Sequence, residues 1–171
     1  YQFRITYTGG DGNDVVLTLV QSNSPPVPSA GSSYSIREGE TLWLDASQST
    51  DADNDALTYQ WDINGDDDFS DAVGNIPSLA WSDLIALGIV DGQSQFSVRV
   101  RASDGVNPPV DSVSTLLVVE NAAPNIEISS ASDSFDGVSG QLRTYALTAT
   151  DPSLTDQASG FTYSVNWGDG S

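Results

Sequence analysis

The segment from residue 62 to residue 71 holds the densest set of oxygen ligands in the chain. Short oxygen-bearing side chains stand at alternate positions and at one further position: Asp62, Asn64, Asp66, Asp68 and Asp71. This alternation lets a tight loop surround one Ca²⁺, as in the first half of an EF-hand loop. The match is partial, because Asp67 replaces the usual Gly and Val73 replaces the bidentate Glu. We expect a calcium site here; the alternative is a solvated acidic turn.

A second run of alternating carboxylates lies just before a predicted strand. Asp51, Asp53 and Asp55 are separated by single residues, the spacing that suits ligands in a loop around a cation. The alternative is a plain turn in which Asp and Asn side chains bond their own backbone.

The segment from Gly9 to Leu17 matches the nonapeptide calcium repeat GGxGxDxUx. A single copy cannot build a β-roll, because neighbouring turns of that structure share each ion. Phe3, Ile5 and Tyr7 alternate with polar residues before the repeat, and the apolar run 15–20 follows it. We therefore interpret the segment as the turn of a β-hairpin.

The composition favours a cation as partner and excludes several other classes. The formal net charge is -19, and the 24 acidic residues comprise 20 Asp and 4 Glu. Asp is the shorter carboxylate and suits turns and calcium loops. The five basic residues are too few to form a patch for nucleic acid or for an anionic membrane, and no apolar run is long enough to span a bilayer. Because cysteine is absent, calcium is the candidate staple outside the cell.

The residue types argue against catalysis. The chain has no His, Cys or Lys, so the usual general bases and activated nucleophiles are absent. Paired carboxylates could in principle hydrolyse a glycoside, but the Asp residues stand at turn-like spacing with no sign of a buried cleft. We predict that the protein is not an enzyme.

The elements that must position these loops are short strands between Gly and Asp turns. Residues 1–22 predict the closing hairpin of a preceding repeat plus a linker, residues 23–120 a complete immunoglobulin-like sandwich, and residues 121–171 the first part of a second, incomplete one. The strands that we expect in the complete sandwich are 33–37, 41–46, 56–63, 94–102 and 112–119. Residues 79–90 predict a short helical turn.

An internal repeat supports tandem modules. Asn23 and Asn121 open similar linkers 98 residues apart, and Leu57-Thr-Tyr59 returns as Phe161-Thr-Tyr163. Alternation places Trp61 and Trp167 in the cores of the two modules. Trp81 is the ring that we expect to be exposed.

The stretches 46–53 and 57–62, the turn 101–105 and the ending Val165-Asn-Trp167-Gly-Asp169-Gly170 resemble PKD and related cadherin-like, immunoglobulin-like modules of large secreted bacterial surface proteins. The resemblance implies tandem all-β sandwiches with calcium bound where linker and loops meet. The implied ligands of the first module are Asn23, Ser24, Asp51, Asp53 and Asp104. Those of the second are Asn121, Asp151 and, with a different spacing, Asp156.

These observations predict a non-catalytic, calcium-stabilised module of a cell-surface stalk, matrix or filament, located outside the cell. The chain opens inside a strand without an initiating Met, so we expect a piece of a longer secreted protein. The expected partners are neighbouring modules of the same chain or identical subunits joined by strand donation. The alternative function is a carbohydrate-binding accessory module of a secreted hydrolase, which would need a row of exposed aromatic rings for polysaccharide.

Overall fold

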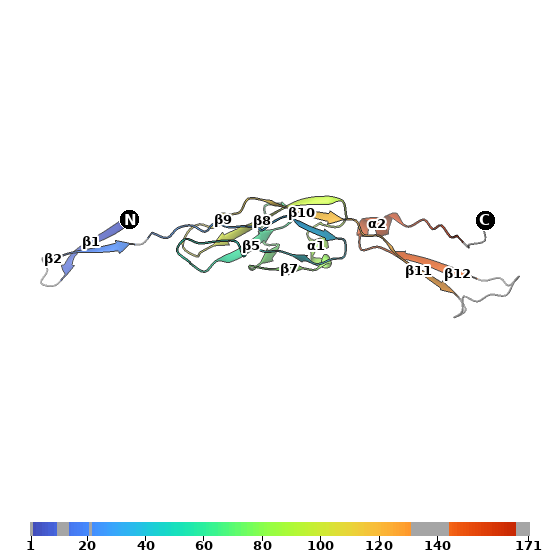
Figure 1. Cartoon of the computed structure of the whole chain (residues 1–171), viewed down its shortest axis with the longest axis horizontal. Coiled ribbons are helices and arrows are strands. Elements are labelled where there is room, and N and C mark those ends of the chain that lie inside the picture. Colours follow the sequence, from blue (N-terminus) through green and yellow to red (C-terminus); the bar gives the residue numbers. More distant parts are fainter. Residues whose placement is uncertain (1, 10–13, 21, 131–143, 167–171) are drawn as a thin grey trace.

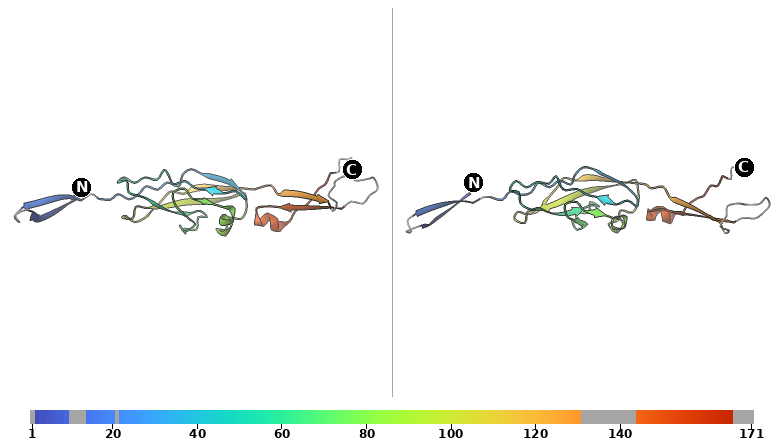
Figure 2. Two further views of the ribbon diagram at one scale, coloured as in Figure 1. Left: turned by 90° about the horizontal axis from the view of Figure 1, so that it is seen from below. Right: turned by 60° about the horizontal axis from the view of Figure 1, so that its bottom comes forward.

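The computed structural model describes residues 2–9, 14–20, 22–130 and 144–166, and it is elongated (Figures 1 and 2). A hairpin of β1 (Gln2–Gly9) and β2 (Asp14–Val20) lies at one end. The central body follows, and a pair of strands, β11 (Asn125–Ser130) and β12 (Tyr145–Thr150), lies at the other end with the short helix α2 (Leu154–Ser159). No described helix is long and apolar enough to cross a membrane.

The main sheet of the central body is six-stranded, in the order β3-β10-β8-β5-β6 with β9 paired to β8. Its strands are β3 (Tyr34–Arg37), β5 (Thr58–Asp62), β6 (Ala72–Val73), β8 (Ser94–Ser103), β9 (Val110–Asp111) and β10 (Thr115–Glu120). β3 runs parallel to β10, and the other pairs are antiparallel. Along β8, Val98, Val100 and Ala102 are buried while Arg99 and Arg101 point outward, as the period of two in its sequence predicts.

A second, two-stranded layer covers this sheet. β4 (Leu42–Trp43) pairs with β7 (Ser78–Leu79), and α1 (Trp81–Ala86) follows directly. The carboxylate of Asp83 accepts a hydrogen bond from the Ala80 N–H at 3.0 Å, which fixes the start of the helix. α1 confirms the helical turn predicted within 79–90.

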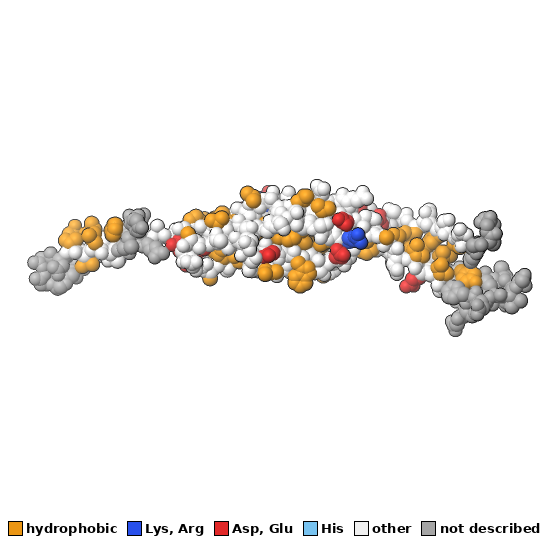
Figure 3. Space-filling view, viewed as in Figure 1, with side chains coloured by type: hydrophobic (Ala, Val, Ile, Leu, Met, Phe, Trp, Pro, Cys, Tyr) orange, Lys and Arg blue, Asp and Glu red, His pale blue; other side chains and the backbone are white. Residues whose placement is uncertain are grey.

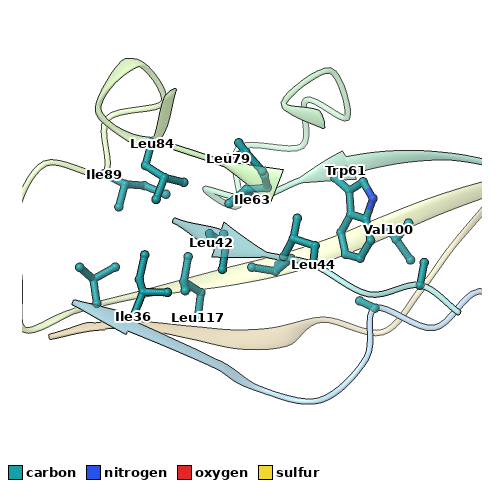
Figure 4. Packing of buried hydrophobic residues seen from close by; sticks show 14 residues of the cluster. Ile36, Leu42, Leu44, Trp61, Ile63, Leu79, Leu84, Ile89, Val100 and Leu117 are labelled. Atoms are coloured by element: carbon teal, nitrogen blue, oxygen red, sulfur yellow. The ribbon is translucent and has the colours of Figure 1, made fainter. Parts of the chain in front are cut away.

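The core lies between these two layers (Figure 4). Trp61 of β5 is fully buried, and its indole Nε1 donates to the Gly74 carbonyl at 2.9 Å. The other large fully buried apolar side chains come from both layers and from the α1 region: Leu42, Leu44, Ile63, Leu84, Ile89, Val98, Val100, Leu117 and Val119. The all-β prediction and the core position of Trp61 are confirmed. Trp167 and the rest of its motif, residues 168–170, lie outside the described residues.

The strands at the two ends of the molecule each expose one apolar face (Figure 3). The pairing of Ile5 with Leu17 puts both side chains on one face of the hairpin, and both are exposed. Ile126 and Ile128 are exposed in the same way on β11. The turn of the hairpin, residues 10–13, lies outside the described residues. Completion of these faces by neighbouring modules or by a donated strand stays a prediction.

Candidate metal sites

The first candidate site lies where the linker enters the central sandwich. We call it the pole group, and its members are Asn23, Ser24, Asp51, Asp53, Asp55 and Asp104. The Ser24 N–H donates to Asp53 Oδ2 at 2.6 Å, and Asn23 Nδ2 donates to Asp104 Oδ2 at 2.8 Å. The structure thus brings together linker, loop 51–55 and the turn after β8, as the resemblance implies.

Asp51 is the member of the pole group whose environment favours a cation. Its Oδ1 accepts hydrogen bonds from the N–H groups of Asp53 at 2.8 Å and Asp55 at 3.3 Å. Its Oδ2 is buried and accepts no hydrogen bond from any described residue. A buried carboxylate oxygen without a partner is costly, and a bound cation would remove that cost. Asp51, Asn54 and Asp55 line a polar surface hollow of about 370 Å³.

The loop 62–71 folds as a chain of turns held by its own side chains. Asn64 Oδ1, Asp66 Oδ1 and Asp68 Oδ1 each accept from the N–H two residues further on, at 3.1, 2.8 and 3.0 Å. Asp67, which stands where an EF-hand has Gly, adopts a left-handed φ of 70°. The backbone therefore takes the conformation for which that Gly is selected, despite the difference in sequence.

Asp71, Asp62 and Arg99 close this loop. Asp71 Oδ2 accepts from the Ile63 N–H at 2.7 Å. Asp62 is fully buried, and Arg99 of β8 pairs with both Asp62 and Asp67. The five predicted ligands therefore share one loop, but no three described carboxylates within it bring ligand atoms within 4.8 Å of one another, and the same is true of the described carboxylates of the pole group.

Asp71 supplies a prediction about pH. Partial burial raises the pKa of Asp71 above 3.8, the charges of Asp66 and Asp62 add to the rise, and the hydrogen bond from Ile63 opposes it. A raised carboxyl pKa means that the folded state binds the proton more tightly, so this group's contribution to stability falls as pH rises from 3.8 through the folded pKa. In EDTA, Asp71→Asn should therefore stabilise the fold at pH 7 by up to about 1 kcal/mol, since Asn keeps an acceptor. Urea unfolding at pH 7 and pH 4 tests this, and a loss of stability at pH 7 would contradict it.

A third acidic group lies at the joint between the central sandwich and the segment after it. The ligand oxygens of Glu38, Asp91 and Asp156 lie within 4.8 Å of one another, and we call these residues the joint group. Glu38 follows β3, Asp91 precedes β8 and Asp156 belongs to α2. Partial burial and the nearby charges of Asp91 and Asp151 raise the pKa of Asp156. Figure 3 shows charged side chains gathered at this joint.

The sequence predicts only part of this joint. Of its predicted ligands, Asp156 joins the group. Asn121 Nδ2 instead donates to the carbonyl of Ala122 at 2.9 Å, and Asp151 Oδ1 accepts from the Ser153 N–H at 2.9 Å. Glu38 and Asp91 were missed because both belong to the preceding module. The sequence feature that could have identified Glu38 and Asp91 is their position before a Gly, in turns next to strands that end near the linker.

Trp81 corrects one expectation. The sequence predicts an exposed ring, but Trp81 is partly buried and its Nε1 donates to the Pro152 carbonyl across the joint at 3.0 Å. Trp81, the first residue of α1, therefore contacts the next segment across the joint and does not offer its ring for ligand stacking. Trp43 is the exposed ring, at 64%. Phe3 and Tyr7 of β1 are further exposed rings among the described residues, so the carbohydrate-binding alternative, which needs such rings in a row, stays a prediction.

Residues 23–83 match the PKD domain family. This match covers the loop 51–55, the loop 62–71 and the linker that contributes to the pole group. The central body contains a PKD-like module. PKD domains are typically extracellular and are generally non-catalytic.

Other comparisons add little to the PKD match. A solved structure of a nucleoside hydrolase-related hypothetical protein from Saccharophagus degradans, described as associated with carbohydrate metabolism, is 21% identical with a TM-score of 0.38. That likeness covers 59% of this chain and 26% of the other, so the chain spans about a quarter of that protein. Comparison with curated proteins gives no match.

Proposed function

We propose that this chain is a calcium-stabilised, non-catalytic structural and adhesion segment of a secreted protein, in which PKD-like modules act as stiff spacers. The observation that carries the proposal is the joint, where side chains of the central module bind the backbone of the segment that follows. A flexible tether would have no such contacts.

The contacts at the joint come from three separate elements. Glu38 Oε2 accepts from the Ala122 N–H at 2.8 Å. Ser153 Oγ donates to Asp91 Oδ1 at 3.0 Å. Trp81 Nε1 donates to the Pro152 carbonyl at 3.0 Å. Gly92 lies so close to the linker that a Cβ there would stand 2.5 Å from Asn121 backbone atoms. These contacts restrain the angle between the two parts of the molecule.

Calcium would act at the pole group and at the joint group. The proposed pole ligands are Asp51, Asp53 and Asp104 with the amide oxygen of Asn23, and the proposed joint ligands are Glu38, Asp91 and Asp156. Carboxylate and amide oxygens are what Ca²⁺ prefers. A cation at each place would offset repulsion among acidic groups in a chain of net charge -19.

We expect chelation to destabilise the protein. A ligand that binds only the folded state at a hundredfold excess over its Kd stabilises by about 2.7 kcal/mol, a shift in Tm on the order of 10 °C. Differential scanning calorimetry in EDTA and in millimolar Ca²⁺ measures this shift. Equal Tm values in the two buffers would contradict the calcium proposal.

A matched pair of variants locates the effect. Asp51→Asn should remove most of the pole contribution to the calcium shift. The substitution replaces one carboxylate oxygen by an NH2 group and removes the negative charge. Asp45→Asn is the control, since Asp45 also accepts a backbone N–H two residues on, at 2.7 Å, but lies outside both groups. Asp45→Asn should therefore keep the parent's calcium shift. An equal loss in both variants would count against a site at Asp51.

A further inference from the structure

The loop 62–71 differs from the pole group in how its buried carboxylate is satisfied. Asp62 Oδ1 accepts from the Gly65 N–H at 2.8 Å. Asp62 Oδ2 accepts from the Asp67 N–H at 3.2 Å and from Arg99 Nη2 at 2.6 Å. Both oxygens of the residue that would be the first calcium ligand are therefore engaged, whereas Asp51 Oδ2 in the pole group accepts no hydrogen bond within the described part of the chain.

Arg99 reaches the loop from a strand that holds it firmly. β8 is a central strand of the main sheet, and Arg99 stands opposite Asp62 in the register of β5 and β8. Its guanidinium also pairs with Asp67 and lies over the Phe69 ring, 5.2 Å from the centroid. Phe69 is itself a buried residue of the loop. The same positive group thus contacts the loop's first carboxylate, its sixth residue and its apolar anchor.

We propose that Arg99 is the resident cation of this loop, so that the loop 62–71 folds without metal although its ligand spacing resembles a calcium loop. A guanidinium supplies the positive charge and the directed donors that a buried carboxylate needs. Arg99 thereby determines which acidic loops of the module respond to calcium. In the pole group, Asp51 accepts its described hydrogen bonds from backbone N–H groups and not from an arginine, so this group remains open to the metal.

The variant Arg99→Met tests this directly, because Met keeps an apolar stem over Phe69 and removes the charge. We expect its Tm in EDTA to fall relative to the parent, and we expect calcium to recover most of that loss. Equilibrium dialysis should show one calcium ion more per chain than in the parent. A folded Arg99→Met that binds no additional calcium would overturn the proposal.

Arg101→Met is the matched control. Arg101 stands two residues further along β8 and lies 3.9 Å from the centroid of the same Phe69 ring, but its ion pair among the described residues is with Asp111 and not with a carboxylate of the loop. It should lose stability in EDTA without gaining a calcium ion. A gain of calcium by this variant would show that lowering the positive charge anywhere on β8 is enough, and would also overturn the proposal.

Asp66→Asn keeps the test decisive if Arg99→Met fails to fold. Asp66 is an exposed predicted ligand, and Asn retains an acceptor for the Asp68 N–H. In the parent background, Asp66→Asn should leave the number of bound calcium ions unchanged. Loss of one ion would mean that calcium occupies the loop despite Arg99. This result is independent of the pole site, which is tested by the calcium-dependent shift in Tm of Asp51→Asn.

Discussion

Replacing Trp61 by Ala should destabilise the central module by about 3–5 kcal/mol, the range for removing a buried aromatic side chain. Trp61 is fully buried, and it packs between the main sheet and the β4–β7 layer (Figure 4). The change leaves a large cavity and also deprives the Gly74 carbonyl of its donor, Trp61 Nε1. Because small domains are stable by only about 5–15 kcal/mol, the variant should be near the limit of folding. Urea unfolding followed by circular dichroism measures the loss.

Two companion variants separate the cavity from the hydrogen bond. Trp61→Phe keeps most of the ring volume and loses the bond to Gly74, so it should cost less than Trp61→Ala. Trp43→Ala removes the same side chain from a site that is 64% exposed, and its effect should stay within about 0.5 kcal/mol. If Trp43→Ala proved as damaging as Trp61→Ala, the assignment of these rings to surface and core would be wrong.

The period of two in the sequence predicted the strands that matter most for the core. The expected strand 94–102 corresponds to β8, which extends one residue further, to Ser103. The expected strands 33–37 and 56–63 contain β3 and β5. The expected strand 112–119 is divided in the structure, since β9 ends at Asp111 and β10 begins at Thr115. Ser112 lies between them, and its hydroxyl accepts from the Val100 N–H at 3.1 Å. The Ser112 hydroxyl therefore takes the place of a backbone carbonyl as the acceptor for the Val100 N–H. The alternation of polar and apolar residues does not predict such an exchange.

The candidate sites were predicted less completely than the strands, because their decisive contacts join residues far apart in the sequence. The pairing of Asp62 with Arg99 spans 37 residues and the contact of Asp91 with Ser153 spans 62. Spacing within a loop indicates possible ligands, but it cannot show that an arginine from another strand already satisfies one of them. The roles of Glu38 and Trp81 at the joint escaped prediction for the same reason.

Replacing Glu38 by Ala should have the second large effect, a loss of about 2–4 kcal/mol. Glu38 is 3% exposed and accepts hydrogen bonds from the N–H groups of Gly92 and Ala122. The change leaves two backbone donors without an acceptor at a buried position, at a cost of about 1–3 kcal/mol each where water cannot replace the carboxylate. It also removes one of the ties between the central module and the linker. Urea unfolding measures the loss of stability, and small-angle X-ray scattering measures the loss of stiffness at the joint.

Glu40→Ala is the control for this prediction, because Glu40 lies in the same turn but is exposed and accepts the nearby Arg37 N–H at 2.8 Å. It should keep the parent's scattering profile. Glu38→Gln separates the charge from the hydrogen bonds: it retains one acceptor oxygen, so it should lose less stability in EDTA than Glu38→Ala, and it should weaken the calcium response of the joint. Scattering profiles of Glu38→Ala that match the parent in EDTA would mean that Trp81 and Ser153 hold the joint without Glu38, and that the carboxylate serves only the stability of the central module.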